Sequence, residues 1–297
     1  MRTTFIETLC QLAKQDDRIW LLTGDLGYSI LERFANLFPE RFLNVGVAEQ
    51  NMVGVAAGLA LSGKIVLTYS IANFATLRCL EQIRNDICYH RINVKIVAVG
   101  GGLAYGSAGH THHALEDLAV MRAMPNMAVI APGDPVETRL ATQAMVGWQG
   151  PCYLRLGKTR EATVHVIEPK FSWGKMLCAK EGRDTVILST GPLLKYAYDF
   201  VHRHRPEWGL WSVPFLKPID DESLLYIARN YLQIITLEEH QRSAGFGSAI
   251  LEGMNDLRER KRIESIPMVK RIAIPDMFAG VAGTPDYLRS LWGLVLS

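Results

Sequence analysis

Short runs of β-branched and aliphatic residues alternate with helix-length segments along most of this chain, and glycine ends many of the runs. In the first half, the runs IWLLTGD, KIVLTYS and VKIVAVG alternate with segments of helical spacing such as ATLRCLEQIRNDICYH. Parallel strands must be joined by a crossover of a dozen or more residues, which is usually a helix. The alternation therefore predicts βαβ units and parallel sheets, that is, an α/β fold.

The chain divides into two such α/β units. Periodicity is weak over KTREATVHVIEPKFSWGK, and beyond it the strand-like runs TVILSTG, GLWSVPFL and LQIITLEEH alternate again with helical segments. We therefore predict two consecutive parallel-sheet α/β domains: a first domain over residues 1–160, a linker over 161–175 and a second domain over 176–297. A chain of 297 residues, 48% of them hydrophobic, can supply a core for each domain.

Charge and cysteine usage exclude several classes of protein. The formal net charge is +2 and the basic residues are dispersed, so nucleic-acid binding is not expected. The five cysteines include no CxxC pair, which argues against a disulfide frame or a zinc site and favours a reducing compartment. The N-terminus lacks a signal-peptide layout, and no apolar run reaches membrane length. We therefore expect a cytoplasmic protein with no membrane partner.

One carboxylate stands at the start of an apolar helix rich in small residues. Glu49 begins the segment EQNMVGVAAGLALSG, which predicts a helix that ends near Gly63. A carboxylate that enters a dry interior needs a partner or a proton, because burial of an unpaired charge is very costly. The alternative is a capping glutamate that faces water, a position that the helix dipole favours.

Further polar residues fall at the predicted carboxyl ends of strands, where open α/β sheets usually bind their ligands. Asp25 follows the strand IWLLT, Tyr69 lies near the end of KIVLTYS, and the loop from His110 to His113 follows VKIVAVG. Three histidines in four residues could bind a metal, but spacing fixes no carboxylate or cysteine partner for them. We therefore predict no metal site in this chain.

Four segments of the first half resemble, in their order and spacing, the pyrimidine-binding domain of transketolases: TGDLGYS, VGVAEQNMVGVAAGLA, YSIANFATLRCLEQIRND and YGSAGHTHHALEDLAVMR. The second half resembles the C-terminal domain of that family through KPID, TLEEH, GFGS and DYLR, so the resemblance covers essentially the whole chain. The layout is closest to the split transketolases, in which this half is a separate subunit. The resemblance implies a thiamine diphosphate pyrimidine-binding domain followed by a transketolase C-terminal-like domain.

The diphosphate-binding segment of the family is missing. Transketolases bind the cofactor's diphosphate and magnesium through a Gly-Asp-Gly segment on a preceding domain, and no Gly-Asp-Gly occurs here. The resemblance therefore implies that thiamine diphosphate is shared with a partner, the N-terminal (diphosphate-binding) subunit, through which Mg²⁺ would be bound. We expect a heterotetramer with two copies of each chain and active sites at the interfaces.

For the cofactor, the resemblance assigns Glu49 to N1′ of the aminopyrimidine ring, a contact that favours the imino tautomer needed to deprotonate thiazolium C2. A carboxyl group in a dry pocket can share a proton with N1′ at neutral pH. Phe74 is the candidate that stacks on the pyrimidine, with Tyr69 in the same pocket, and Asp25 matches an aspartate near the cofactor and the subunit contact. The alternatives are core packing for the two aromatic residues and a loop turn for Asp25.

For the substrate, the resemblance implies that His112 faces the donor ketose, where an imidazole can donate to its oxygens and assist proton transfer. His113 is a second candidate beside it. Arg2, Ser29 and Arg155 match positions that hold the substrate phosphate in transketolases, a task that suits the guanidinium fork. A plain surface role is the alternative for both arginines.

Two departures from the family pattern bear on the substrate. Ala108 stands where many transketolases have an aspartate that reads a hydroxyl of the acceptor, so acceptor preference is expected to differ. Gly100 stands where some members have a phosphate-binding histidine, so the phosphate clamp is expected to be weaker.

Taken together, these features predict a transketolase subunit, a transferase that passes a two-carbon ketol unit from a ketose (phosphate) donor to an aldose acceptor and is active only with its partner. One alternative is a decarboxylating relative, either deoxyxylulose-phosphate synthase-like or similar to the β subunit of a 2-oxo acid dehydrogenase. The other is a non-catalytic dimerisation subunit, against which the presence of Glu49 and His112 argues. Glu238, Glu239 and His240 of the second domain are expected to be structural.

Overall fold

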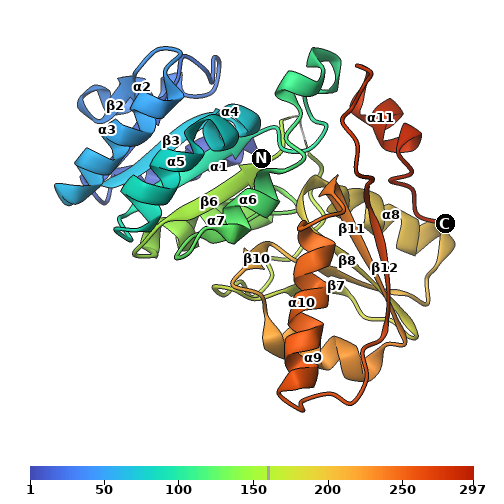
Figure 1. Ribbon diagram of the computed structural model, residues 1–297. Coiled ribbons are helices and arrows are strands. Elements are labelled where there is room, and N and C mark those ends of the chain that lie inside the picture. Colours follow the sequence, from blue (N-terminus) through green and yellow to red (C-terminus); the bar gives the residue numbers. More distant parts are fainter. Residues whose placement is uncertain (159–160) are drawn as a thin grey trace.

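The first domain is built on a seven-stranded sheet (Figure 1). The computed structural model describes residues 1–158 and 161–297. The strand order is β10-β5-β6-β4-β3-β1-β2, and all neighbours pair in parallel except β10 and β5. The strands are β1 (Ile19–Thr23), β2 (Phe42–Asn44), β3 (Ile65–Ile71), β4 (Val94–Val99), β5 (Ala128–Ile130), β6 (Cys152–Leu156) and β10 (Phe215–Lys217).

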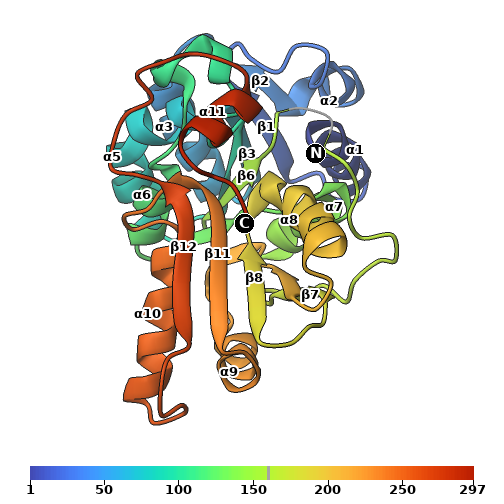
Figure 2. The ribbon, with the colours of Figure 1, turned by 90° about the vertical axis from the view of Figure 1, so that its right-hand side faces the viewer.

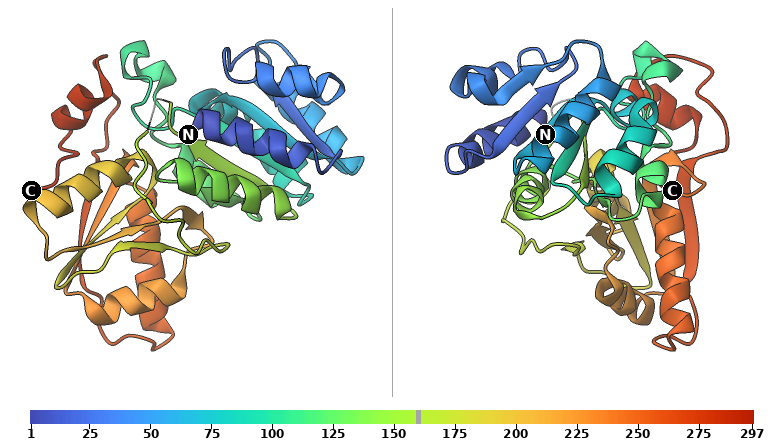
Figure 3. Two further views of the ribbon diagram at one scale, coloured as in Figure 1. Left: turned by 180° about the vertical axis from the view of Figure 1, so that it is seen from behind. Right: turned by 60° about the vertical axis from the view of Figure 1, so that its left-hand side comes forward.

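Helices cover both faces of this sheet, and Figure 3 shows α1 and α7 side by side on one of them. The helices of the first domain are α1 (Arg2–Ala13), α2 (Glu32–Leu37), α3 (Glu49–Leu61), α4 (Ala72–Thr76), α5 (Leu80–Gln82), α6 (Asp117–Ala123) and α7 (Pro135–Gly147). Successive side chains of a strand point to opposite faces. β3 therefore directs Leu67 and Tyr69 toward Phe5 of α1, and Ser70 toward Glu49 of α3.

The second domain has a five-stranded sheet of order β12-β11-β8-β9-β7, in which only the edge strand β7 runs antiparallel. Its strands are β7 (Leu177–Lys180), β8 (Thr185–Ser189), β9 (Gly209–Ser212), β11 (Gln233–Gln241) and β12 (Met268–Ile274). Its helices are α8 (Leu194–His204), α9 (Asp221–Asn230), α10 (Phe246–Glu259) and α11 (Pro285–Leu291). The predicted fold class, two consecutive α/β domains, is confirmed.

The two domains are joined at three places. β10 belongs by sequence to the second half but completes the first sheet, where Phe215 pairs with Ile130. The segment after β12 returns over the first domain to α11 (Figure 2), and Gly283 N donates to the carbonyl of Gly106 there. One apolar cluster also runs without a break from α3 of the first domain to α10 of the second.

The segment predicted as a linker, 161–175, contains neither helix nor strand in the structure and packs against the first domain. Asp134, the N-cap of α7, accepts from the backbone N–H groups of Val164 and His165, and His165 Nε2 lies 2.7 Å from Glu137 Oε1. Further along, Trp173 stacks on Trp148. Among the residues that the structure describes, no helix combines the length and the apolar character needed to cross a membrane.

Candidate active site

Glu49 is the first residue of α3 and is buried, with 1% of its surface exposed. Its Oε1 accepts from Ser70 Oγ at 3.3 Å and its Oε2 accepts from Arg78 Nη1 at 2.7 Å. Gly24, at the end of β1, lies against its side chain, because a Cβ there would sit 3.4 Å from Glu49 Cγ. The capping glutamate that faces water is therefore excluded, and the buried carboxylate has the cationic partner that its charge requires.

A broken helix brings Phe74 and Arg78 next to Glu49. After α4 the chain forms a 3₁₀ turn over Leu77–Cys79, then α5, and then a π-helical turn over Ile83–Cys88. The Arg78 guanidinium lies over the Phe74 ring, 4.7 Å from its centroid, while it donates to Glu49. Sequence reasoning missed Arg78; its position four residues after an aromatic on a helix was the available signal.

His112 lies beside Phe74, as the family resemblance led us to expect. The ring centroids are 5.2 Å apart in an edge-on arrangement, and on its other side His112 lies 6.0 Å from Tyr105. Asn73 ties this loop to α4 by donating to the carbonyl of Thr111 at 2.7 Å. The side chains Glu49, Arg78, Phe74, His112 and Tyr105 thus form one continuous row of contacts.

His113 is buried under the same loop. Its Nε2 lies 3.2 Å from the carbonyl of Gly106, so Nε2 carries the proton, and burial lowers the pKa of the imidazole. Its Nδ1 has no hydrogen-bond partner among the described residues. The structure therefore places His112, and not His113, beside Phe74, and His113 supports the loop from below.

Tyr69 lies on the opposite face of the sheet from Glu49. It is buried against Phe5, with ring centroids 6.2 Å apart, and burial raises the pKa of its phenol while the positive charge of Arg2 partly offsets the rise. Ser70, the next residue, is the one that faces Glu49. The expectation that Tyr69 shares the pocket of Glu49 is thus corrected, because the alternation of the strand separates them.

Arg155 does not reach the cleft either. It is buried, pairs with both oxygens of Asp117 at 2.8 and 3.1 Å, and donates to the carbonyls of Ala114 and Glu239. A Cβ at Gly101 would stand only 2.1 Å from its Nε, so the site has no room for an anion. The predicted contact of Arg155 with a substrate phosphate is therefore wrong, and so is the alternative of a surface arginine. Arg155 braces the two domains.

Lys158 and Arg2 are the cations that lie near the row of contacts. Lys158 Nζ is 3.9 Å from the centroid of Tyr105. Burial and the positive charge of Arg2 both lower the pKa of Lys158, which places the two cations near each other. Among the described residues, neither forms an ion pair with a carboxylate. Two neighbouring cations without a counter-charge favour an anionic ligand.

Asp25 and Ser29 lie in the loop after β1, and both have a left-handed backbone, with φ of 59° and 62°. Asp25 Oδ1 accepts from Tyr28 Oη at 3.0 Å and from Asn44 Nδ2 at 3.1 Å. Ser29 N donates to Glu32. Both residues are exposed, and the carboxylate of Asp25 serves the loop turn that was its alternative role.

The polar residues at the end of β11 make structural contacts. Glu238 accepts from the backbone N–H groups of Phe246 and Gly247, and Glu239 pairs with Arg289. His240 Nδ1 donates to the carbonyl of Gln241 and its Nε2 accepts from Ala119 N, so the ring is neutral, and burial lowers its pKa to about 4.

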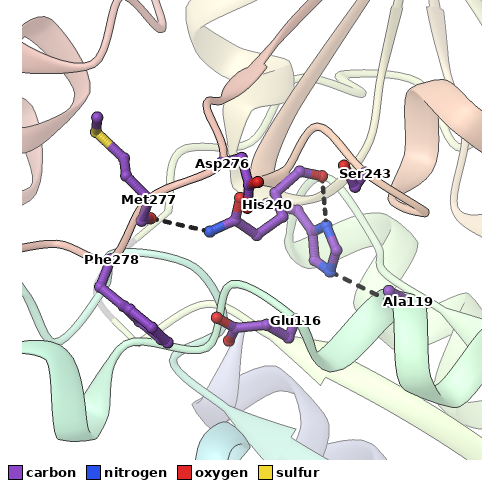
Figure 4. A pocket seen from close by; sticks show the side chains of 8 residues that line it. Glu116, Ala119, His240, Ser243, Asp276, Met277 and Phe278 are labelled. Carbon is purple, nitrogen blue, oxygen red and sulfur yellow. Dashed lines mark hydrogen bonds between the residues drawn. The ribbon is translucent and has the colours of Figure 1, made fainter.

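A cavity of about 400 Å³ opens beside His240, between α6 and the segment after β12 (Figure 4). Phe278, of which 78% is exposed, forms its outer wall. Glu116 faces it from the start of α6. The polar cluster of β11 therefore joins the domains and does not open into the row of contacts around Glu49.

The fold and this site define a class of protein, the pyrimidine-binding half of a thiamine diphosphate enzyme joined to a C-terminal α/β domain. Family models agree: residues 1–161 match the transketolase pyrimidine-binding domain and residues 174–295 match the transketolase C-terminal domain. The chain therefore belongs to the transketolase family, whose cofactor is thiamine diphosphate.

Its relatives are separate transketolase subunits. The putative transketolase C-terminal section of Methanocaldococcus jannaschii is 37% identical over 99% of this chain and 92% of its own length. One of the subunits of the apulose-4-phosphate transketolase of Phocaeicola vulgatus is 36% identical over 90% and 87%. A solved structure described as a split gene transketolase, inactive beta4 tetramer, superposes with a TM-score of 0.88 at 37% identity over 99% and 93% of the two chains. The chain is thus a transketolase-type subunit, an enzyme of ketol transfer.

The decarboxylating alternative has weaker support. The 1-deoxy-D-xylulose-5-phosphate synthase of Thermus thermophilus is 33% identical, but this chain spans only 45% of its length.

Proposed function

We propose that this chain supplies the cofactor-activating half of a split transketolase, in which Glu49 hydrogen-bonds N1′ of the aminopyrimidine. The observation that carries the proposal is the burial of Glu49 beside an aromatic ring, Phe74, and a hydroxyl, Ser70. These groups fit a flat ring that needs one carboxyl contact at its edge and an aromatic neighbour. Bound thiamine diphosphate would supply a stabilised acyl-anion equivalent.

The donor is proposed to be a ketose phosphate that lies along the row from Phe74 to Tyr105. His112 stands midway and can donate to the sugar oxygens or move a proton. Lys158 and Arg2, beyond Tyr105, would hold the phosphate in place of Arg155, together with Ser29. Ala108 is exposed in the same loop and brings no carboxylate to an acceptor hydroxyl, which supports an altered acceptor preference.

The remainder of the site is proposed to come from a partner chain. A diphosphate-binding N-terminal subunit would hold the diphosphate through Mg²⁺, with Asp25 near the subunit contact, in a heterotetramer of two plus two chains. The name of the solved relative supports this arrangement, because a tetramer of the β chain alone is described there as inactive.

Calorimetry tests this proposal directly. Thiamine diphosphate with Mg²⁺ is titrated into this chain, into a candidate diphosphate-binding subunit and into their mixture, and ketol transfer from a ketose phosphate to an aldehyde is then assayed. We expect tight binding and transfer only in the mixture. Tight binding to the isolated chain would show a diphosphate site of its own and contradict the shared site.

A further inference from the structure

Arg78 makes, in this structure, both contacts that the proposed function reserves for the aminopyrimidine. Its guanidinium donates to Glu49 Oε2 at 2.7 Å, where a protonated ring edge would donate. The same group lies over the Phe74 ring at 4.7 Å, where a flat heterocycle would stack. A guanidinium is planar, cationic and rich in N–H donors, so it resembles an aminopyrimidine in both respects.

The two ends of this ion pair differ in burial. Of the Glu49 side chain 1% is exposed, but of the Arg78 side chain 44% is exposed. The carboxylate is therefore fixed in the protein while its cationic partner can leave for water.

The backbone at Arg78 is held in place while the side chain is free to move. Gln50 Nε2 donates to the carbonyl of Arg78 at 3.0 Å, which anchors the 3₁₀ turn to the start of α3. Rotation of the side chain alone would release Glu49 and uncover Phe74. Half-exposed arginines exchange rotamers within nanoseconds, so the movement needs no change of fold.

We propose that Arg78 occupies the aminopyrimidine position of the cofactor-free chain, neutralises Glu49 there, and moves to solvent when the cofactor enters. The inference rests on the proposed function and adds to it a competition between a side chain and the cofactor for one carboxylate. Arg78 is thus a positioning residue that keeps a buried charge paired until the shared site is complete. Cofactor affinity should be reduced by the energy needed to break the pair.

The test is the affinity of the complete complex for thiamine diphosphate, measured by calorimetry with Mg²⁺ present. We expect Arg78→Met to bind about fivefold tighter than the unchanged protein, because an ion pair with one exposed partner no longer competes. Arg84→Met is the matched control, since Arg84 lies on the same helical stretch, is exposed and contacts only Asn85. We expect no change in that variant. Equal or weaker binding by Arg78→Met would overturn the inference.

A second variant guards against loss of folding. Arg78→Lys keeps a cation for Glu49 but loses the flat group that stacks on Phe74, and we expect about twofold tighter binding. Weaker binding by this variant would show that Arg78 assists the bound cofactor and would overturn the inference. Absence of binding by the unchanged complex would instead contradict the proposed function, and the inference with it.

Discussion

At the scale of single residues, the charge of Glu49 is the fact from which the rest of the site follows. A carboxylate that is 1% exposed must be paired, and its partners Ser70 and Arg78 come from β3 and from the broken helix after it. The position of one acid thus determines which side chains must meet at the end of the sheet.

Substitution of Glu49 by Gln should abolish measurable turnover of the reconstituted complex. The amide fills the same space and still accepts from Arg78, so we expect the free energy of unfolding to change by less than about 1 kcal/mol. The loss of the carboxyl contact to N1′ should lower kcat by at least about 100-fold. Steady-state kinetics and urea unfolding measure the two quantities. Glu40→Gln, at an exposed position, is the control, and retained activity in Glu49→Gln would refute the role of Glu49.

Arg155 and Lys158 should respond to substitution in opposite ways. Arg155→Met leaves Asp117 buried and unpaired, so we expect a loss of about 3–5 kcal/mol in the free energy of unfolding. Lys158→Met leaves no buried charge, so stability should hold while the KM for a phosphorylated donor rises about tenfold. Urea unfolding and donor kinetics on both variants measure this. A stable Arg155→Met with a raised KM would restore the original assignment.

The sequence allowed Glu49 and His112 to be chosen because each sits in a short motif of its own. Arg155 could not be judged in the same way, because its partners lie 38 and 84 residues away in the chain. Tyr69 was misplaced for a different reason. A strand end predicts the edge of the sheet, but only the partners of neighbouring residues show which face a side chain takes.

At the scale of elements, α3 carries both the acid and a bare outer face. Gly54 and Gly58, one turn apart, are exposed, and a Cβ at either would meet nothing within 4 Å. Glycine within a helix costs about 0.5–1 kcal/mol relative to alanine, so the isolated chain gains nothing from these two residues. A partner that packs closely on α3 would explain their presence.

Substitution of Gly58 by Leu should therefore separate folding from assembly. We expect the isolated chain to be as stable as before or slightly more stable, and its affinity for the partner subunit to fall at least tenfold, because the larger side chain blocks close packing. Thermal unfolding and analytical ultracentrifugation of the mixture measure these effects. Gly147→Leu, at the open end of α7, is the control. Assembly of Gly58→Leu at the unchanged affinity would place the interface elsewhere.

Most elements followed from periodicity, including α1, α3, β1, β3 and β4. The helix expected over ATLRCLEQIRNDICYH is instead broken into α, 3₁₀ and π turns. The apolar spacing of this segment fits a continuous helix, so its sequence contains no sign of the break. Packing of Arg78 and Cys79 around the buried Glu49 is what the break accommodates.

At the scale of the whole molecule, one apolar cluster and a buried polar junction hold the domains together. His240 at this junction is neutral and its pKa is lowered to about 4. An unfolded chain binds a proton at this histidine below about pH 6.5, whereas the folded chain does not until about pH 4. The stability that the neutral ring contributes is thus present above pH 6.5 and is lost as the pH falls toward 4.

From pH 7 to pH 5, the contribution of His240 to the free energy of unfolding should fall by about 2 kcal/mol. His240→Asn cannot bind this proton, so its stability should depend less steeply on pH in that interval, by the same amount. Burial raises the pKa of Glu238 to about 7, which gives the opposite slope, but it does so in both proteins and cancels in the comparison. Urea unfolding at several pH values measures the difference. Parallel pH profiles would show that His240 is not the titrating group.

The two-domain division could be predicted because texture changes along the sequence. The exchange of β10 between the halves could not, since a three-residue strand has no periodicity and its partner β5 lies about 85 residues earlier. The missing half of the active site was visible only as an absence, the lack of a diphosphate-binding segment.

The borrowed strand β10 limits how such subunits can be recombined. A hybrid cut within 161–175, with the second domain taken from a relative, would place a foreign strand on β5 and a foreign Lys217 against the carbonyls of Arg122 and Met124. Domain exchange by gene fusion must therefore treat Phe215–Lys217 as cargo of the first domain. In evolutionary terms, the two domains have had to diversify as a pair.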